Sequence, residues 1–155
     1  MRYWTEFQKL DRSDRQLLLV MSVALPLIAA SVRILGFVRV FSVLGRMVDG
    51  CSAAESMNED EYTGRIRRLT RYIKLRGIFR GNCLSRSLLM WTVLKRKGIE
   101  CELIFGSRFR DGQFQAHAWV ERNSLPLNAG KHVRRNYVVF DHDFESDQPA
   151  QPLTF

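Results

Sequence analysis

The first third of the chain is strongly apolar, and its hydrophobic positions predict helix. Residues 13–46 form the most apolar stretch, and the 17 residues from Gln16 to Val32 carry no charge. Ser13 or Asp14 is expected to cap the first helix, and Pro26 to kink it or to divide it in two. Seventeen helical residues span about 26 Å, slightly less than a ~30 Å hydrocarbon core. A buried helical hairpin and a membrane-surface helix both fit this stretch better than a membrane span does.

A second, amphipathic helix is predicted at about residues 59–75, after a polar loop at 50–60. Its apolar positions recur at i, i+4, i+7 and i+11, which is the spacing of one helix face. They are Tyr62, Ile66, Leu69 and Ile73. The remaining face is basic, with Arg65, Arg67, Arg68, Arg71 and Lys74. Such a face is either simply solvated or a docking surface for an acidic peptide.

The helix predicted at about 83–97 has the clearest boundaries. Asn82 is suited to the N-cap and Gly98 to the left-handed position that follows a helix. Strand-like runs come next, and the tail at 141–155 is expected to be loosely ordered. The strands are predicted at 100–107, 114–122, 125–128 and 137–140. Helices followed by antiparallel strands make the expected fold class α+β, with a helical region at 1–78 and a second domain at 79–155.

Composition narrows the class of protein. The chain has 155 residues, 46% of them apolar and 11% aromatic, which is enough for a folded core and excludes a disordered protein. Its three cysteines show no C-x-x-C spacing, so neither a disulfide framework nor a zinc site is expected, and a reducing cytoplasm is the simplest compartment. The net charge of +8 is compatible with nucleic acid, an anionic membrane or an acidic polypeptide. No nucleic-acid-binding motif accompanies it.

Cys83 is the best candidate nucleophile. It follows the expected cap Asn82, so it lies where unpaired N–H groups and the helix dipole stabilise a thiolate. Arg86, one turn later, adds a positive charge. A small apolar residue in a helix cap would occupy the same position, so position alone does not separate a reactive cysteine from a structural one.

His117 supplies the matching base. It lies in the predicted strand 114–122, between Ala116 and Ala118, which leave the neighbouring positions uncrowded. A lone strand histidine is usually structural. Together with a thiol at a helix N-terminus, however, it forms the arrangement of thiol hydrolases, in which a third group orients the imidazole.

Asn128 is the preferred third group. A two-residue turn at 123–124 places Trp119 opposite Asn128, and alternation of side chains then puts Asn128 on the same face as His117 and diagonal to it. Two carboxylates after the last predicted strand are the rival candidates, Asp141 and Asp143.

The other polar residues are poorer candidates. His132 lies among basic residues, and His142 lies between two aspartates with no second cluster of metal ligands. Ser85 and Ser87 have no base nearby in the sequence. Cys51 lies in a loop, and Cys101 alternates with apolar residues as a core position does. We therefore expect no metal and no cofactor.

These segments resemble the lasso-peptide B2 proteins, which are transglutaminase-like cysteine peptidases, in their stand-alone form. The resemblance covers nearly the whole chain and is most specific around the cysteine and the histidine. The segments are Asn82-Cys83-Leu84-Ser85-Arg86-Ser87, Gly98-Ile99, Ala116-His117-Ala118-Trp119-Val120-Glu121, Pro126-Leu127-Asn128 and the opening Asp14-Arg15-Gln16-Leu17-Leu18-Leu19. The family often has Asp directly after the Asn of this motif, where this chain has Ala129, so that Asp has no counterpart here.

The resemblance implies a papain/transglutaminase-like domain at 79–155 and an enzyme that removes the leader from a ribosomally made precursor peptide. It implies catalysis by Cys83 and His117, with Asn128 as third member, and an oxyanion donor at the Cys83 N–H. A small leader-binding protein and a macrolactam cyclase are the implied partners. An acyltransferase and a non-catalytic membrane-associated adaptor remain the alternatives. The basic residues at 65–74 are then expected to bind a partner or the leader, with anionic lipid as the second choice.

Overall fold

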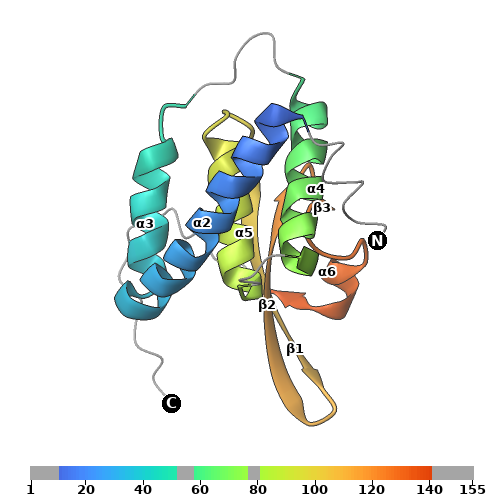
Figure 1. The fold of residues 1–155 in the computed structure, drawn as a ribbon. Helices are drawn as coiled ribbons and strands as arrows, with labels where there is room; N and C mark the ends of the chain where they lie inside the picture. Colours follow the sequence, from blue (N-terminus) through green and yellow to red (C-terminus); the bar gives the residue numbers. More distant parts are fainter. Residues whose placement is uncertain (1–10, 52–57, 77–80, 141–155) are drawn as a thin grey trace.

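A computed structural model describes residues 11–51, 58–76 and 81–140 of the chain, and it confirms the α+β class. Helices pack together on one side of a small antiparallel sheet, and the β1–β2 hairpin extends beyond them (Figure 1). The helices are α2 (Arg12–Leu35), α3 (Phe37–Val48), α4 (Glu59–Arg76), α5 (Cys83–Lys95) and the short α6 (Val133–Asn136). The strands are β1 (Glu102–Arg110), β2 (Gln113–Arg122), β3 (Leu125–Pro126) and β4 (Val138–Val139).

The apolar N-terminal stretch forms two helices, but the predicted boundaries are wrong in two places. Asp11, rather than Ser13 or Asp14, caps α2 through its side chain. Pro26 lies inside α2, and the helix ends instead at Gly36, whose φ of 83° is available to glycine at little cost. Proline removes one hydrogen bond and its ring crowds the carbonyl four residues earlier, but α2 continues through it, with Leu25 before it and Ile28 after it packed in the core.

Helix α4 is where the sequence predicted it, and charged side chains attach it at its N-terminal end. The Arg65 guanidinium pairs with Asp14 and donates to Ser13 Oγ at 2.6 Å, which links α4 to the start of α2. Arg122, at the end of β2, pairs with Glu59 and Asp60 in the first turn of α4. The residues suggested as caps for α2 therefore join two helices.

The sheet has the strand order β3-β2-β1-β4. The two-residue turn at 123–124 is confirmed, because Arg122 pairs with Leu125 and both turn residues have positive φ. The β1–β2 turn is tighter than predicted and consists of Asp111 and Gly112, so β1 continues to Arg110. Helix α6 was not predicted, and the expected tail at 141–155 lies outside the described residues.

Helix α5 is the centre of the core. Leu88, Met90 and Leu94 of α5 are fully buried, and Met90 and Leu94 belong to one apolar cluster with residues of every long helix and of the sheet. From the N-terminal helix, Met21 and Leu25 reach this cluster. Burial on all sides fixes the direction of α5, and with it the position of Cys83 at its first residue.

Candidate active site

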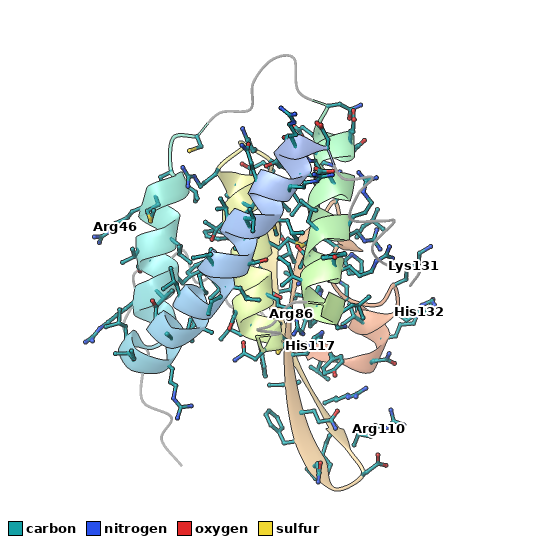
Figure 2. All side chains as sticks on the ribbon, in the orientation of Figure 1. Arg46, Arg86, Arg110, His117, Lys131 and His132 are labelled. Carbon is teal, nitrogen blue, oxygen red and sulfur yellow. The ribbon has the colours of Figure 1, made fainter. Side chains whose placement is uncertain are left out.

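Cys83 is the first residue of α5, and the expected cap is present. The Asn82 side chain accepts a hydrogen bond from the Ser85 N–H at 2.8 Å and another from the Ser85 hydroxyl at 2.6 Å. The Ser85 N–H is thus occupied by the cap, and the N–H groups of Cys83 and Leu84 lie beside the thiol. Figure 2 shows Arg86 and His117 close together at this end of the helix.

The Cys83 thiol is hydrogen-bonded to His117, so the structure brings the predicted nucleophile of α5 to the predicted base of β2. This bond is the main reason that the pKa of Cys83 falls from 9.0 to about 7. Partial burial opposes the shift, and the backbone N–H groups of Ala118 and Leu84 support it. At neutral pH a large share of Cys83 is therefore thiolate, the nucleophilic form.

Helix α5 packs against the edge of β2 at the point where β3 has ended. Ser87, one turn after Cys83, donates from its hydroxyl to the Ala118 carbonyl at 2.9 Å. Ala118 is buried and its side chain is small, so the helix approaches the strand backbone closely. The Ala118 carbonyl lies on the edge of β2 that β3 does not reach, and Ser87 of α5 is its partner there. This contact holds the first turn of α5, with Cys83, against β2.

Asn128 belongs to the same contact. Its Oδ1 accepts from the Val120 N–H at 2.9 Å, and its Nδ2 donates to Ser87 Oγ at 2.9 Å. Asn128 and His117 line one cavity, but none of the hydrogen bonds among the described residues joins their side chains. The orienting role of Asn128 stays a prediction, and the structure gives it a positioning role between β2 and α5. The rival candidates Asp141 and Asp143 lie outside the described residues.

Aromatic rings surround His117 on its face of the sheet. The imidazole lies 5.9 Å from the Trp119 ring and 5.4 Å from the Tyr137 ring, measured between centroids. Gly106 pairs with His117 across β1 and β2, and a Cβ at this glycine would stand 3.0 Å from atoms of both Trp119 and Tyr137. Glycine here lets the two rings close around the imidazole and restrict its rotation.

A buried carboxylate holds Trp119 in turn. Glu121 is 2% exposed and accepts from the Trp119 indole N–H at 2.6 Å and from Arg134 at 2.6 and 2.9 Å. Burial raises the pKa of Glu121, but the hydrogen bonds from Arg134 and Trp119 outweigh it, so that the pKa lies below its ordinary value. Glu121 is not among the site residues predicted from the sequence. The available sign of its role was that His117, Trp119 and Glu121 alternate along one face of the strand.

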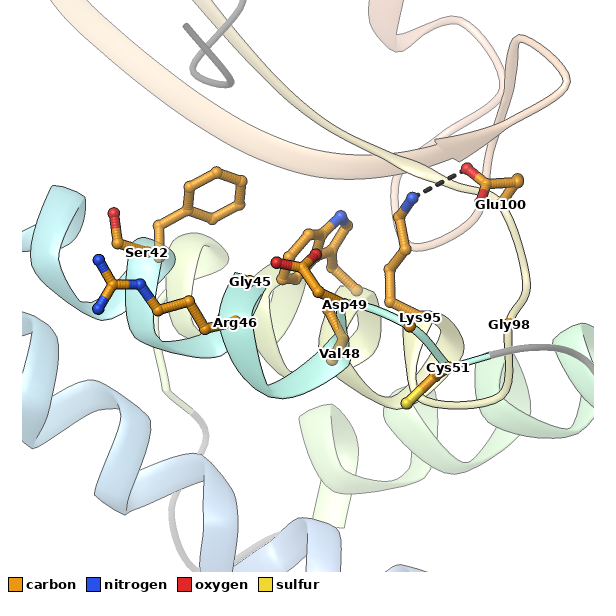
Figure 3. Close-up of a pocket in the computed structure, with 12 residues that line it drawn as sticks. Ser42, Gly45, Arg46, Val48, Asp49, Cys51, Lys95, Gly98 and Glu100 are labelled. Carbon is orange, nitrogen blue, oxygen red and sulfur yellow. Dashed lines mark hydrogen bonds and ion pairs between the residues drawn. The ribbon is translucent and has the colours of Figure 1, made fainter. Parts of the chain in front are cut away.

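The remaining cysteines and histidines lie elsewhere. Burial raises the pKa of the Cys101 thiol to about 12, so Cys101 is a core residue as expected. His132 is exposed beside α6, and Figure 2 shows it well separated from His117. Cys51 lines a second cavity of about 570 Å³ over the C-terminal part of α5, where Lys95 pairs with Glu100 (Figure 3). Among the described residues, no histidine lines that cavity. His142 lies outside the described residues.

A comparison with protein families finds a match over most of the chain. Residues 22–140 match the transglutaminase-like superfamily. The chain belongs to this superfamily. The matched region begins in α2 and ends after β4, so it contains both Cys83 and His117. The superfamily includes cysteine peptidases and transglutaminases, both of which use a thiol nucleophile. Searches of curated proteins and of solved structures give no match.

Proposed function

We propose that this chain is a cysteine endopeptidase that removes the leader from a ribosomally made precursor peptide of the lasso class. The observation that carries the proposal is the hydrogen bond between Cys83 and His117 at the N-terminus of α5. The thiol pKa of about 7 supports a nucleophilic role. The segments around both residues, which resemble lasso-peptide B2 proteins, support the choice of substrate.

In this mechanism His117 takes the proton of the Cys83 thiol, and the resulting thiolate attacks the carbonyl carbon of the scissile peptide bond. The oxyanion that forms accepts a hydrogen bond from the Cys83 N–H, which the Asn82 cap does not occupy. The carbon–nitrogen bond then breaks as the His117 imidazolium gives its proton to the departing amine, which is the new N-terminus of the core peptide. Water, deprotonated by His117, attacks the thioester, releases the leader as a carboxylic acid and restores the thiol.

The proposed partners follow from the same resemblance. A small leader-binding protein presents the precursor to the peptidase, and a macrolactam cyclase uses the amine that the cleavage frees. Release of the leader is accordingly expected to accelerate when the leader-binding protein is present.

The test is a reconstituted cleavage reaction followed by mass spectrometry. A lasso precursor peptide and its leader-binding protein are incubated with the wild-type chain, with Cys83→Ala and with Cys51→Ala as the matched control. We expect leader and core to appear with the wild type and Cys51→Ala only. Leader release by Cys83→Ala would reject the nucleophile, and no release by the wild type would reject the substrate class.

Two further measurements distinguish the proposed function from the two alternative functions. In H₂¹⁸O a hydrolase places one ¹⁸O in the leader carboxylate, whereas an acyltransferase yields a leader amide only when an acceptor amine is added. For a non-catalytic adaptor, Cys83 would react with iodoacetamide no faster than Cys51. We expect one ¹⁸O in the leader carboxylate and alkylation of Cys83 that is faster than that of Cys51.

We also propose that the protein acts in the cytoplasm at the membrane surface. Helix α2 is long and apolar enough to cross a bilayer, but a core helix meets the same criteria, and Leu18, Met21 and Leu25 are buried against the rest of the protein. Its other face, continued on α3, exposes many large apolar side chains, and it adjoins three exposed arginines, Arg33, Arg39 and Arg46. Apolar side chains flanked by cations are typical of helices that lie on anionic membranes.

A further inference from the structure

A cavity of about 590 Å³ opens beside His117, and one face of α4 forms its basic wall. The wall residues follow the spacing i, i+3, i+4, i+7 and i+10, so they share one side of the helix. They are Gly64, Arg67, Arg68, Arg71 and Lys74, and Thr70 of the same helix also lines the cavity. Arg86 of α5 and residues 127–130 after β3 line the rest, together with His117. We call this space the α4 cavity.

The apolar face of α4 explains why the cations point into the cavity. Ile66, Leu69 and Ile73 are buried in the core, as the sequence predicted, so the opposite face of the helix must turn outward. The arginines of this face therefore lie beside residues 127–130 and His117, although they are far from them in the sequence.

The cavity has an excess of positive charge that the described residues do not balance. Within residues 11–51, 58–76 and 81–140, none of the ion pairs includes Arg67, Arg68, Arg71 or Lys74, and all four side chains are exposed. Two of the three acidic residues of α4, Glu59 and Asp60, pair with Arg122 instead, and the third, Glu61, does not line the cavity. No acidic residue is found among the described residues that line the cavity.

Such a cavity is complementary to a carboxylate. A guanidinium group presents parallel N–H donors that match the two oxygens of a carboxylate, and several cations in one partly enclosed space attract an anion more strongly than a single exposed cation does. The opposite wall is small and uncharged, formed by Leu127, Asn128, Ala129 and Gly130. It leaves room for an extended peptide between this loop and α4.

We infer that the α4 cavity binds an acidic side chain of the peptide substrate, close to the bond that Cys83 attacks, and that Arg67, Arg68 and Arg71 determine this specificity. The inference rests on the proposed function to the extent that the substrate is a peptide that reaches Cys83. The ligand is the carboxylate of an Asp or Glu side chain within the substrate.

The test uses three acetylated hexapeptide amides with a neutral fluorophore, which have Glu-Glu, Gln-Gln or Lys-Lys at their centre and Ala elsewhere. Binding to the full chain is measured by fluorescence anisotropy at low salt. In parallel, unlabelled peptides of the same sequences are tested for protection of Cys83 against iodoacetamide. We expect the Glu-Glu peptide to bind roughly tenfold more tightly than the Gln-Gln peptide and to slow alkylation of Cys83.

The matched variants change the same net charge at different places. Arg67→Gln/Arg68→Gln/Arg71→Gln is expected to lose the preference for Glu-Glu and the protection of Cys83. Arg39→Gln/Arg46→Gln/Lys97→Gln, at exposed positions outside the cavity, is expected to keep both. Gln is a good helix former, so both variants are expected to fold, which circular dichroism verifies.

Three results would overturn the inference: equal binding of the Glu-Glu and Lys-Lys peptides, binding of Glu-Glu that leaves Cys83 unprotected, or equal loss in both variants. Failure of the proposed function has a different signature, because it appears as slow alkylation of Cys83 in the absence of any peptide, or as no leader release.

Discussion

At the scale of single residues, the reactivity of Cys83 depends chiefly on His117. The imidazole lowers the pKa of the thiol to about 7, whereas burial alone would raise it. Cys101 shows the opposite result in the same protein, since burial without such a partner raises its pKa to about 12. The hydrogen bond, and not the thiol itself, therefore distinguishes the candidate nucleophile.

This difference predicts how alkylation depends on pH. The iodoacetamide reaction of Cys83 is expected to reach half its maximal rate near pH 7, because thiolate accumulates as the pH rises through the pKa. In His117→Ala the midpoint should move toward higher pH. Peptide mapping by mass spectrometry measures both, with Cys101 as an internal control that stays unmodified near neutral pH in the folded protein. An unchanged midpoint in His117→Ala would contradict the assigned cause.

Glu121 is expected to stabilise the fold in a pH-dependent way. Its folded pKa lies below the ordinary 4.5, so the carboxylate contributes fully above that pH, and its contribution is lost as the pH falls through the folded pKa. We expect Glu121→Gln to lower the free energy of unfolding by about 1–2 kcal/mol at pH 7, with the difference shrinking below about pH 4.5. Urea unfolding of both proteins at pH 7, 5 and 3 measures it. A difference that is constant over this range would mean that ionisation of Glu121 has no part in it.

At the scale of elements, the decisive contact is that between α5 and the edge of β2. The predicted turn is correct, because Arg122 does pair with Leu125, but β3 ends at Pro126 and the strand pairing does not extend to Asn128. The predicted hydrogen bond of its side chain is not the one found, since the Val120 N–H and the Ser87 hydroxyl are its partners. The alternation of side chains along a strand predicts which face of the sheet a residue occupies. It does not predict that a helix from an earlier part of the chain packs against the edge of that strand.

Two roles of Asn128 can be separated by experiment. If it positions α5, Asn128→Ala and Ser87→Ala should both lower the melting temperature and reduce the rate of leader release by similar factors. If it orients His117, Asn128→Ala alone should reduce the rate severely, by roughly a hundredfold or more, with a changed pH profile. We expect Asn128→Ala to lose more activity than Asp141→Ala, and the opposite ranking would make Asp141 the orienting residue.

The sequence predicted the helices and the long strands well because each has a clear period and a clear end. Asn82 caps α5, Gly98 has the predicted positive φ in the turn that follows its C-cap Arg96, and the apolar stripe of α4 is regular. What it did not predict depends on residues far apart in the chain, such as the rings of Trp119 and Tyr137 beside His117. A glycine inside a strand, Gly106, was the available sign that another group approaches closely at that point.

At the scale of the whole molecule, the basic cavity and the exposed apolar surface lie on different helices. The α4 cavity gathers arginines beside His117, whereas α2 and α3 expose apolar side chains, with Leu19, Val23 and Leu27 each more than 60% exposed. Substrate binding and membrane binding would therefore use separate surfaces of one small protein.

Vesicle binding tests the membrane surface directly. We expect the protein to float with vesicles that contain phosphatidylglycerol and much less with phosphatidylcholine alone. Leu19→Gln/Val23→Gln/Leu27→Gln should weaken this binding several-fold, because each apolar side chain that enters the interface contributes to affinity. The matched control is Leu75→Gln/Leu125→Gln/Val138→Gln, which changes equally exposed apolar residues on other elements. Equal binding of both variants would exclude α2 as the membrane surface.

The most direct test of the central claim is to trap the thioester between Cys83 and the leader. The wild-type chain is mixed with a lasso precursor peptide and its leader-binding protein, quenched in acid within milliseconds to seconds and examined by intact-protein mass spectrometry. We predict an adduct with the mass of the leader acyl group, mapped to Cys83 and absent in Cys83→Ala. Cleavage of the precursor without such an adduct, at an unchanged rate in Cys83→Ala, would contradict the account.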